Sequence, residues 1–87
     1  MTLFGQLGYF FLQTELNTGL TFASIALQSR NLKWPEKVKR NRANARTAFD
    51  TIIRFRKQVP LTAAQASEIE HGFQRLRERL VELGEPL

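Results

Sequence analysis

Apolar residues recur at helical spacing in three stretches of the chain, and turn-forming residues separate these stretches. Lys and Arg residues occupy one face of the middle stretch, residues 35–57. The opposite face of that stretch is made of Val38, Ala45, Ala48, Phe49, Ile52 and Phe55. This pattern predicts a helix with one side packed in a core and the other side facing water or an anion.

The first stretch, residues 7–29, is more apolar than one packed neighbour requires. Its main stripe is Leu12, Leu16, Gly19 or Leu20, Ala23 and Leu27, and it is widened by Phe11, Phe22 and Ile25. We expect a helix with so broad an apolar face to contact two other helices or a second subunit. We interpret Gly19 as a point of close helix approach, whereas Gly5 and Gly8 predict an irregular start before residue 7.

The third stretch, residues 62–83, has the clearest start signal in the sequence. Thr62 and Gln65 have the spacing of a capping box, and Leu61 is placed to pack on Ala66 as its hydrophobic staple. Gly84 suits a left-handed helix end, and a proline two residues later prevents the helix from continuing. The apolar residues of this stretch alternate at spacings of three and four, and they are Ala66, Ile69, Phe73, Leu76, Leu80 and Leu83.

Short connections join the three predicted helices. Pro35 fits the first position of a helix, and Pro60 disfavours helical geometry at the residue before it. We interpret Trp34, just before Pro35, as a cover over the end of the core rather than as a platform on which a ligand stacks. Short connections place consecutive helices antiparallel. The predicted fold class is therefore all-α, with residues 1–87 forming a single domain, an antiparallel up-down-up three-helix bundle.

Length and composition limit the depth of any pocket and indicate where in the cell the protein is found. A chain of 87 residues can bury one core but has little length left to build a deep pocket. It contains no Cys, which excludes disulfides and thiolate metal sites, and we expect a cytoplasmic location. The first residues lack the basic region and cleavage site of a signal peptide, and polar residues interrupt their apolar run. We therefore expect neither a removed signal nor membrane insertion.

Positive charge is concentrated in the middle of the chain. The net charge is +5, yet residues 30–57 alone carry ten Lys or Arg residues against Glu36 and Asp50. Glu15 is the only charged residue in the sequence of residues 1–29. Such a basic segment attracts nucleic acid, anionic lipid or an acidic peptide, and it also suits a face that is simply solvated. Asp50 lies four residues from both Arg46 and Arg54, so it partly offsets the basic face.

The sequence contains no recognisable catalytic or metal-binding motif. The one histidine, His71, is expected to be exposed, and neither a second His nor a Cys is present to complete a metal site with it. Gly5 and Gly8 are not followed by the Lys-Ser/Thr pair of a phosphate loop. Glu68 and Glu70 would point in different directions on a helix. We expect a protein that is not an enzyme and that uses no cofactor, metal or small-molecule substrate.

The stretch 41–53 resembles a known type of helical hairpin. Small Ala45 and Ala48 beside Phe49 are similar to the second helix of tetratricopeptide-type hairpins and of the three-helix microtubule-interacting and trafficking (MIT) domain. Gly19 and Ala45 are too far apart for the tetratricopeptide unit and no second repeat follows, so the length and helix count suit the MIT-like fold better. The resemblance implies a groove between helices that receives a partner's helix.

Two function classes follow from these patterns. The first is a helical protein-interaction or self-association module, for which a homodimer is plausible, because the first helix offers more apolar surface than a three-helix core absorbs. Its candidate interface is Leu3, Phe4, Leu7, Tyr9, Phe10 and Phe11, although these residues could instead complete the chain's own core. The alternative is nucleic-acid binding by a basic face on the second predicted helix, with an anionic membrane surface as a weaker third candidate. The residues of this candidate anion-binding face are Lys39, Arg42, Arg46, Arg54 and Lys57.

Overall fold

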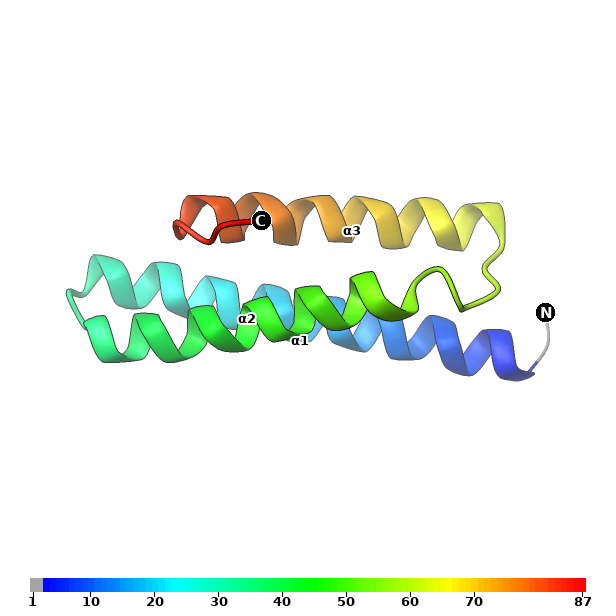
Figure 1. Ribbon diagram of the computed structural model, residues 1–87, viewed down its shortest axis with the longest axis horizontal. Coiled ribbons are helices and arrows are strands. Elements are labelled where there is room, and N and C mark those ends of the chain that lie inside the picture. The colour runs from blue at the N-terminus through cyan, green and yellow to red at the C-terminus, as the bar shows by residue number, and fades with distance from the viewer. Residues whose placement is uncertain (1–2) are drawn as a thin grey trace.

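Three helices run up, down and up along a molecule that measures 46 Å in one direction and 17 Å in the other two (Figure 1). The computed structural model describes residues 3–87, apart from the side chain of Phe4. The helices are α1 (Leu3–Asn31), α2 (Pro35–Phe55) and α3 (Ala63–Glu82). This arrangement confirms the predicted all-α three-helix bundle.

The first helix begins earlier than expected. Gly5 and Gly8 lie inside α1, so the prediction of an irregular start before residue 7 is wrong. A Cβ on Gly8 would lie 2.5 Å from Cγ1 of Val59, in the turn after α2. Tertiary packing against this turn therefore compensates for the poor helix propensity of glycine. At the other boundary, α2 ends at Phe55 and Lys57 lies in the following turn.

The turn between α1 and α2 closes the end of α1 with two hydrogen bonds. The backbone N–H of Trp34 donates to the carbonyl of Ser29, and that of Lys33 donates to the carbonyl of Arg30, both at 3.0 Å. This is a Schellman motif, and it requires a left-handed residue, here Lys33 with φ 57°. The tight turn lets α2 start at Pro35 and run back along α1.

The third helix has the ends that its sequence predicts. The backbone N–H of Gln65 donates to the hydroxyl of Thr62, and the N–H of Thr62 donates to the side chain of Gln65, both at 3.1 Å. At the far end Gly84 is left-handed with φ 84°, and the N–H of Glu85 donates to the carbonyl of Leu80 at 2.9 Å. This second Schellman motif turns residues 84–87 back along the bundle (Figure 1).

Each helix contributes one face to a shared core. The rings of Phe49 and Phe73 stack with centroids 4.7 Å apart and join α2 to α3. On the predicted core faces of α2 and α3, Ala66 is exposed and Val38 is only partly buried, whereas Phe55 is partly buried and packs against the core. The buried apolar residues are Leu12, Leu16, Ala23, Ala26, Ala45, Ala48, Phe49, Ile52, Ile69, Phe73, Leu76, Leu80 and Leu83.

Close approach between helices occurs at Gly19, as the sequence predicts. A Cβ on this residue would lie 2.8 Å from Cδ2 of Leu76 in α3 and 3.1 Å from Cβ of Ala48 in α2. The absence of a side chain at Gly19 thus lets α1 pack against both other helices at one level.

Candidate functional site

The candidate interface residues on α1 divide into exposed and partly buried groups. Leu3 is 72% exposed, and Leu7 and Phe10 are each 60% exposed. Phe11 is 40% exposed and places its ring edge-on to that of Phe55, with centroids 5.7 Å apart. The sixth candidate, Phe4, has its side chain outside the described part of the chain.

Tyr9 is tied to α3 instead of facing outward with its neighbours. Its hydroxyl donates a hydrogen bond to the carboxylate of Glu68. The side-chain amide of Gln13 donates to the other oxygen of that carboxylate at 3.0 Å. Because the hydrogen bond to Glu68 holds the phenolic proton, it raises the pKa of Tyr9 above its ordinary value. Tyr9 therefore belongs to the contact between α1 and α3.

The exposed side of α1 carries no charged residue over most of its length. We call this side the uncharged face. The exposed sides of α2 and α3 differ from it because both contain charged residues of both signs. Its residues recur along α1 at alternating spacings of four and three, and all of them are exposed. The residues of the uncharged face are Leu3, Leu7, Phe10, Thr14, Asn17, Thr21, Ser24 and Gln28. At the rise of an α-helix it is roughly 37 Å long.

The structure separates the five candidate anion-binding residues. Lys39, Arg42 and Arg46 line one groove beside the turn between α1 and α2. Arg54 lies outside this groove, with its guanidinium over the ring of Phe55, 5.5 Å from the centroid. Lys57 is also outside the groove, in the turn that follows α2.

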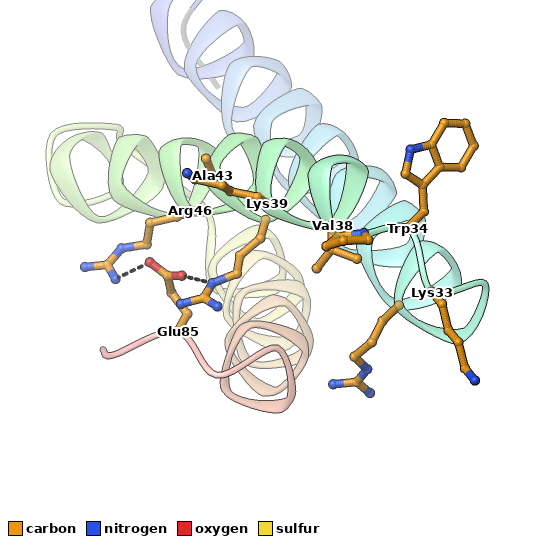
Figure 2. Close-up of a pocket in the computed structure, with 10 residues that line it drawn as sticks. Lys33, Trp34, Val38, Lys39, Ala43, Arg46 and Glu85 are labelled. Atoms are coloured by element: carbon orange, nitrogen blue, oxygen red, sulfur yellow. Dashed lines mark hydrogen bonds and ion pairs between the residues drawn. The ribbon is translucent and has the colours of Figure 1, made fainter.

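Glu85 occupies one end of that groove. Its carboxylate accepts hydrogen bonds from Arg42 and from Arg46, the latter at 3.1 Å. Figure 2 shows this carboxylate directed toward Arg46, whereas Trp34 stands at the opposite end. The guanidinium of Arg42, reinforced by that of Arg46, lowers the pKa of Glu85 despite its partial burial. Asp50 also pairs with Arg46, at 3.0 Å.

The groove has a volume of about 930 Å³ and a strongly basic lining. Five cationic side chains line it against the single carboxylate of Glu85. Trp34 is 54% exposed, and so the expectation that it covers the end of the core is wrong. We call this site the basic groove, and its lining residues are Arg30, Lys33, Trp34, Pro35, Val38, Lys39, Arg42, Ala43, Arg46 and Glu85.

Sequence reasoning identified some residues of these surfaces and missed others. It found Lys39, Arg42 and Arg46 from their shared helix face, but not Glu85, which follows a different helix. The turn signal at Gly84 was recognised, yet the direction in which that turn sends the chain depends on how α3 packs. The lack of charge at the exposed positions of α1 was visible in the sequence. These positions lie opposite the apolar stripe of the same helix.

The part of the chain that the structure describes has neither a metal-binding cluster nor a membrane-spanning helix. Within residues 3–87, no three His, Asp or Glu side chains are grouped so that they could hold a metal ion. His71 is exposed, as expected. None of the helices described has the length and hydropathy needed to cross a membrane. Comparisons with protein-family models, with curated proteins and with solved structures found no match.

Proposed function

We propose that this chain is a non-enzymatic helical module that associates with a second copy of itself through the uncharged face of α1. The observation that carries the proposal is that Leu3, Leu7 and Phe10 remain at least 60% exposed on a face without charge. Large apolar side chains grouped on a helix surface are typical of protein contacts. Burying each one fully contributes about 1.5–3 kcal/mol.

The spacing of the face suits a helix partner. Alternating steps of four and three keep one line of side chains on the same side of an α-helix, as in the seam of a coiled coil. Leu3, Leu7 and Phe10 form the apolar part of this line, and the Thr, Asn and Ser residues that follow are small and neutral. A partner helix could therefore approach along the face without removing a charge from water, which is costly.

A second copy is the occupant that the charge distribution favours. The chain carries a net charge of +5 that is concentrated in residues 30–57, so two copies repel each other where their α2 surfaces face one another. The uncharged face is where two copies can meet without opposing like charges. In a two-fold contact the same patch lies on both sides. Apolar residues meet apolar residues when the N-terminal halves of the two α1 helices lie together, so we expect that arrangement.

The mass in solution tests the proposal. We expect the purified chain to be a dimer by light scattering after size-exclusion chromatography, and Phe10→Glu to be a monomer with unchanged helical circular dichroism. Val81→Glu is the matched control, because Val81 is 55% exposed but lies on α3. This variant should remain a dimer. A monomeric parent chain at every concentration, or a dimeric Phe10→Glu, would overturn self-association through this face.

Cross-linking tests the arrangement of the two helices. The chain has no Cys, so a single introduced thiol has no background. Gln6 and Gln28 are both exposed and lie near opposite ends of α1. With the N-terminal halves together, Gln6→Cys should form an intermolecular disulfide readily. If the helices were antiparallel over their full length, neither Gln6→Cys nor Gln28→Cys would do so.

Nucleic-acid binding is the alternative function. Lys39, Arg54 and Lys57 are exposed and available to phosphates. Arg42 and Arg46 already hold Glu85, so a phosphate would have to displace this carboxylate. If the alternative holds, nucleic acid should bind more weakly as salt increases, and replacing Arg42 and Arg46 by Glu should abolish binding. The MIT-like resemblance stays an expectation, under which a partner's helix would lie between two helices of this chain.

A further inference from the structure

The basic groove lies apart from the uncharged face and has a composition of its own. Five cations line it, whereas the carboxylate of Glu85 occupies only one end. In the rest of the groove, no ion pair joins Lys33 or Lys39 to a carboxylate within the described part of the chain. Positive charge that its own chain leaves unbalanced attracts an anionic ligand.

The chain's own segment 84–87 shows how this groove holds a ligand. The carboxylate of Glu85 forms ion pairs with Arg42 and Arg46, and the Glu85 side chain is only 15% exposed. Arg46 also donates to the backbone carbonyl of Pro86 at 2.6 Å, and Arg42 donates to that of Gly84 at 3.3 Å. The two arginines thus bind a carboxylate together with main-chain carbonyls, a combination of acceptors that a peptide ligand offers.

The unoccupied end of the groove combines charge with apolar surface. Trp34 is more than half exposed there, beside partly buried Val38. Lys33 is exposed in the adjoining turn, and Lys39, exposed on α2, lies farther along the groove toward Ala43 (Figure 2). Lys37 lies over the Trp34 ring, with its ammonium 4.8 Å from the centroid, so that the cation already covers one face of the ring. This end suits an acidic side chain next to an apolar one better than it suits a stacked base.

We propose that the basic groove binds a short acidic peptide segment of a partner protein, which takes the open end at Trp34 and Lys33, extends past Lys39 and competes with Glu85 for Arg42. The segment 84–87 then acts as an internal competitor that a partner must displace in part. This inference concerns a surface different from the one proposed for self-association, so either can fail without the other.

Fluorescence gives a direct test, because Trp34 is the single tryptophan of the chain. The probe is a labelled synthetic peptide of Glu, Ser and Leu, and its control is the same peptide with every Glu replaced by Gln. We expect the acidic probe to bind by fluorescence anisotropy and to shift the emission of Trp34 to shorter wavelength, since it would cover the ring. The Gln probe should not bind.

Matched charge reversals separate the groove from general attraction. Lys39→Glu and Arg54→Glu change the net charge equally and both lie exposed on α2, but only Lys39 lines the groove. We expect Lys39→Glu to weaken binding about tenfold or more, the loss expected at an interfacial charge pair. Arg54→Glu should retain most of the affinity. Glu85→Gln should bind the probe several-fold more tightly, because the internal competitor has lost its charge.

Three results would overturn the inference. The first is no binding of the acidic peptide by either the parent chain or Glu85→Gln. The second is equal loss of binding in Lys39→Glu and Arg54→Glu, which would indicate attraction by net charge alone. The third is binding of labelled single-stranded DNA or RNA with the same dependence on Lys39 while the acidic peptide fails to bind, which would assign the groove to nucleic acid.

Discussion

At the scale of single residues, Gly19 shows how one missing side chain sets the packing of all three helices. A glycine inside a helix costs about 1 kcal/mol relative to alanine, so helix propensity alone favours replacing it. Its position opposes this preference, because a Cβ would meet Ala48 as well as Leu76. The Cβ of Ala48 is attached directly to the backbone of α2 and cannot rotate away.

Gly19→Ala should therefore lower the free energy of unfolding, by about 1 kcal/mol, because overpacking costs more than the gain in helix propensity. Gly72→Ala is the matched control. A Cβ there would approach Cδ1 of Leu16 to 2.9 Å, but this atom is the far end of a flexible side chain. Gly72→Ala should leave stability unchanged or raise it slightly. Urea denaturation measures both changes, and equal stability of the two variants would contradict this account.

At the scale of elements, the ends of the helices differ in their capping hydrogen bonds and in the residue at the left-handed position. The start of α3 has a complete capping box, whereas the N-cap residue of α2, Trp34, makes no side-chain capping hydrogen bond. The end of α3 has glycine at its left-handed position, whereas the end of α1 has Lys33 there. A side chain in this conformation costs about 1–2 kcal/mol. The connection between α1 and α2, which forms one end of the basic groove, therefore holds a strained residue.

Lys33→Gly should raise the free energy of unfolding by about 0.5–1 kcal/mol, since the relief of strain exceeds the extra backbone entropy of glycine in the unfolded chain. Such a gain corresponds to a rise in Tm of several degrees in a domain of this size. Lys57→Gly removes the same charge from a turn where φ is not positive, so it should not stabilise. Thermal unfolding by circular dichroism compares them, and a gain shared by both variants would point to charge and not to conformation.

At the scale of the whole molecule, polar contacts link α3 to the rest of the bundle at both of its ends. Near its start, Glu68 accepts from Tyr9 and Gln13 of α1, and Glu70 pairs with Arg56 at 3.1 Å. Beyond its end, Glu85 is held by Arg42 and Arg46 of α2, and Arg30 donates to the carbonyl of Glu82 at 3.0 Å. These contacts add to the apolar packing and set the position of α3 along the α1–α2 hairpin.

The contact of Glu85 predicts a pH dependence of stability. The arginines lower its pKa in the folded chain, so its contribution is fully present above the ordinary pKa of glutamate, about 4.3. That contribution is lost as the pH falls through the lowered value, because both states then bind the proton. Glu85→Gln should be less stable than the parent at pH 7, and the difference should shrink on acidification. A difference in Tm that stays constant from neutral to acidic pH would argue against this ion pair.

Much of the fold follows from two local patterns in the sequence, the spacing of apolar residues and the residues that cap helix ends. Apolar spacing identified the three helices because each residue's place on a helix follows from its position in the chain. Thr62, Gln65 and Gly84 identified the ends of α3 because capping involves neighbours only. The start of α1 was missed because Gly5 and Gly8 are poor helix formers, and the contact that allows Gly8 comes from Val59, far along the chain.

The candidate surfaces depended more on tertiary structure. Residue spacing alone shows that α1 has apolar residues beyond its core stripe and that α2 has a basic face. Only the packing of the helices decided that Leu7 and Phe10 stay exposed, that Tyr9 turns to Glu68, and that Glu85 reaches Arg42. The physical reason is that exposure and ion pairing depend on which helix faces cover one another. That arrangement joins residues separated by most of the chain.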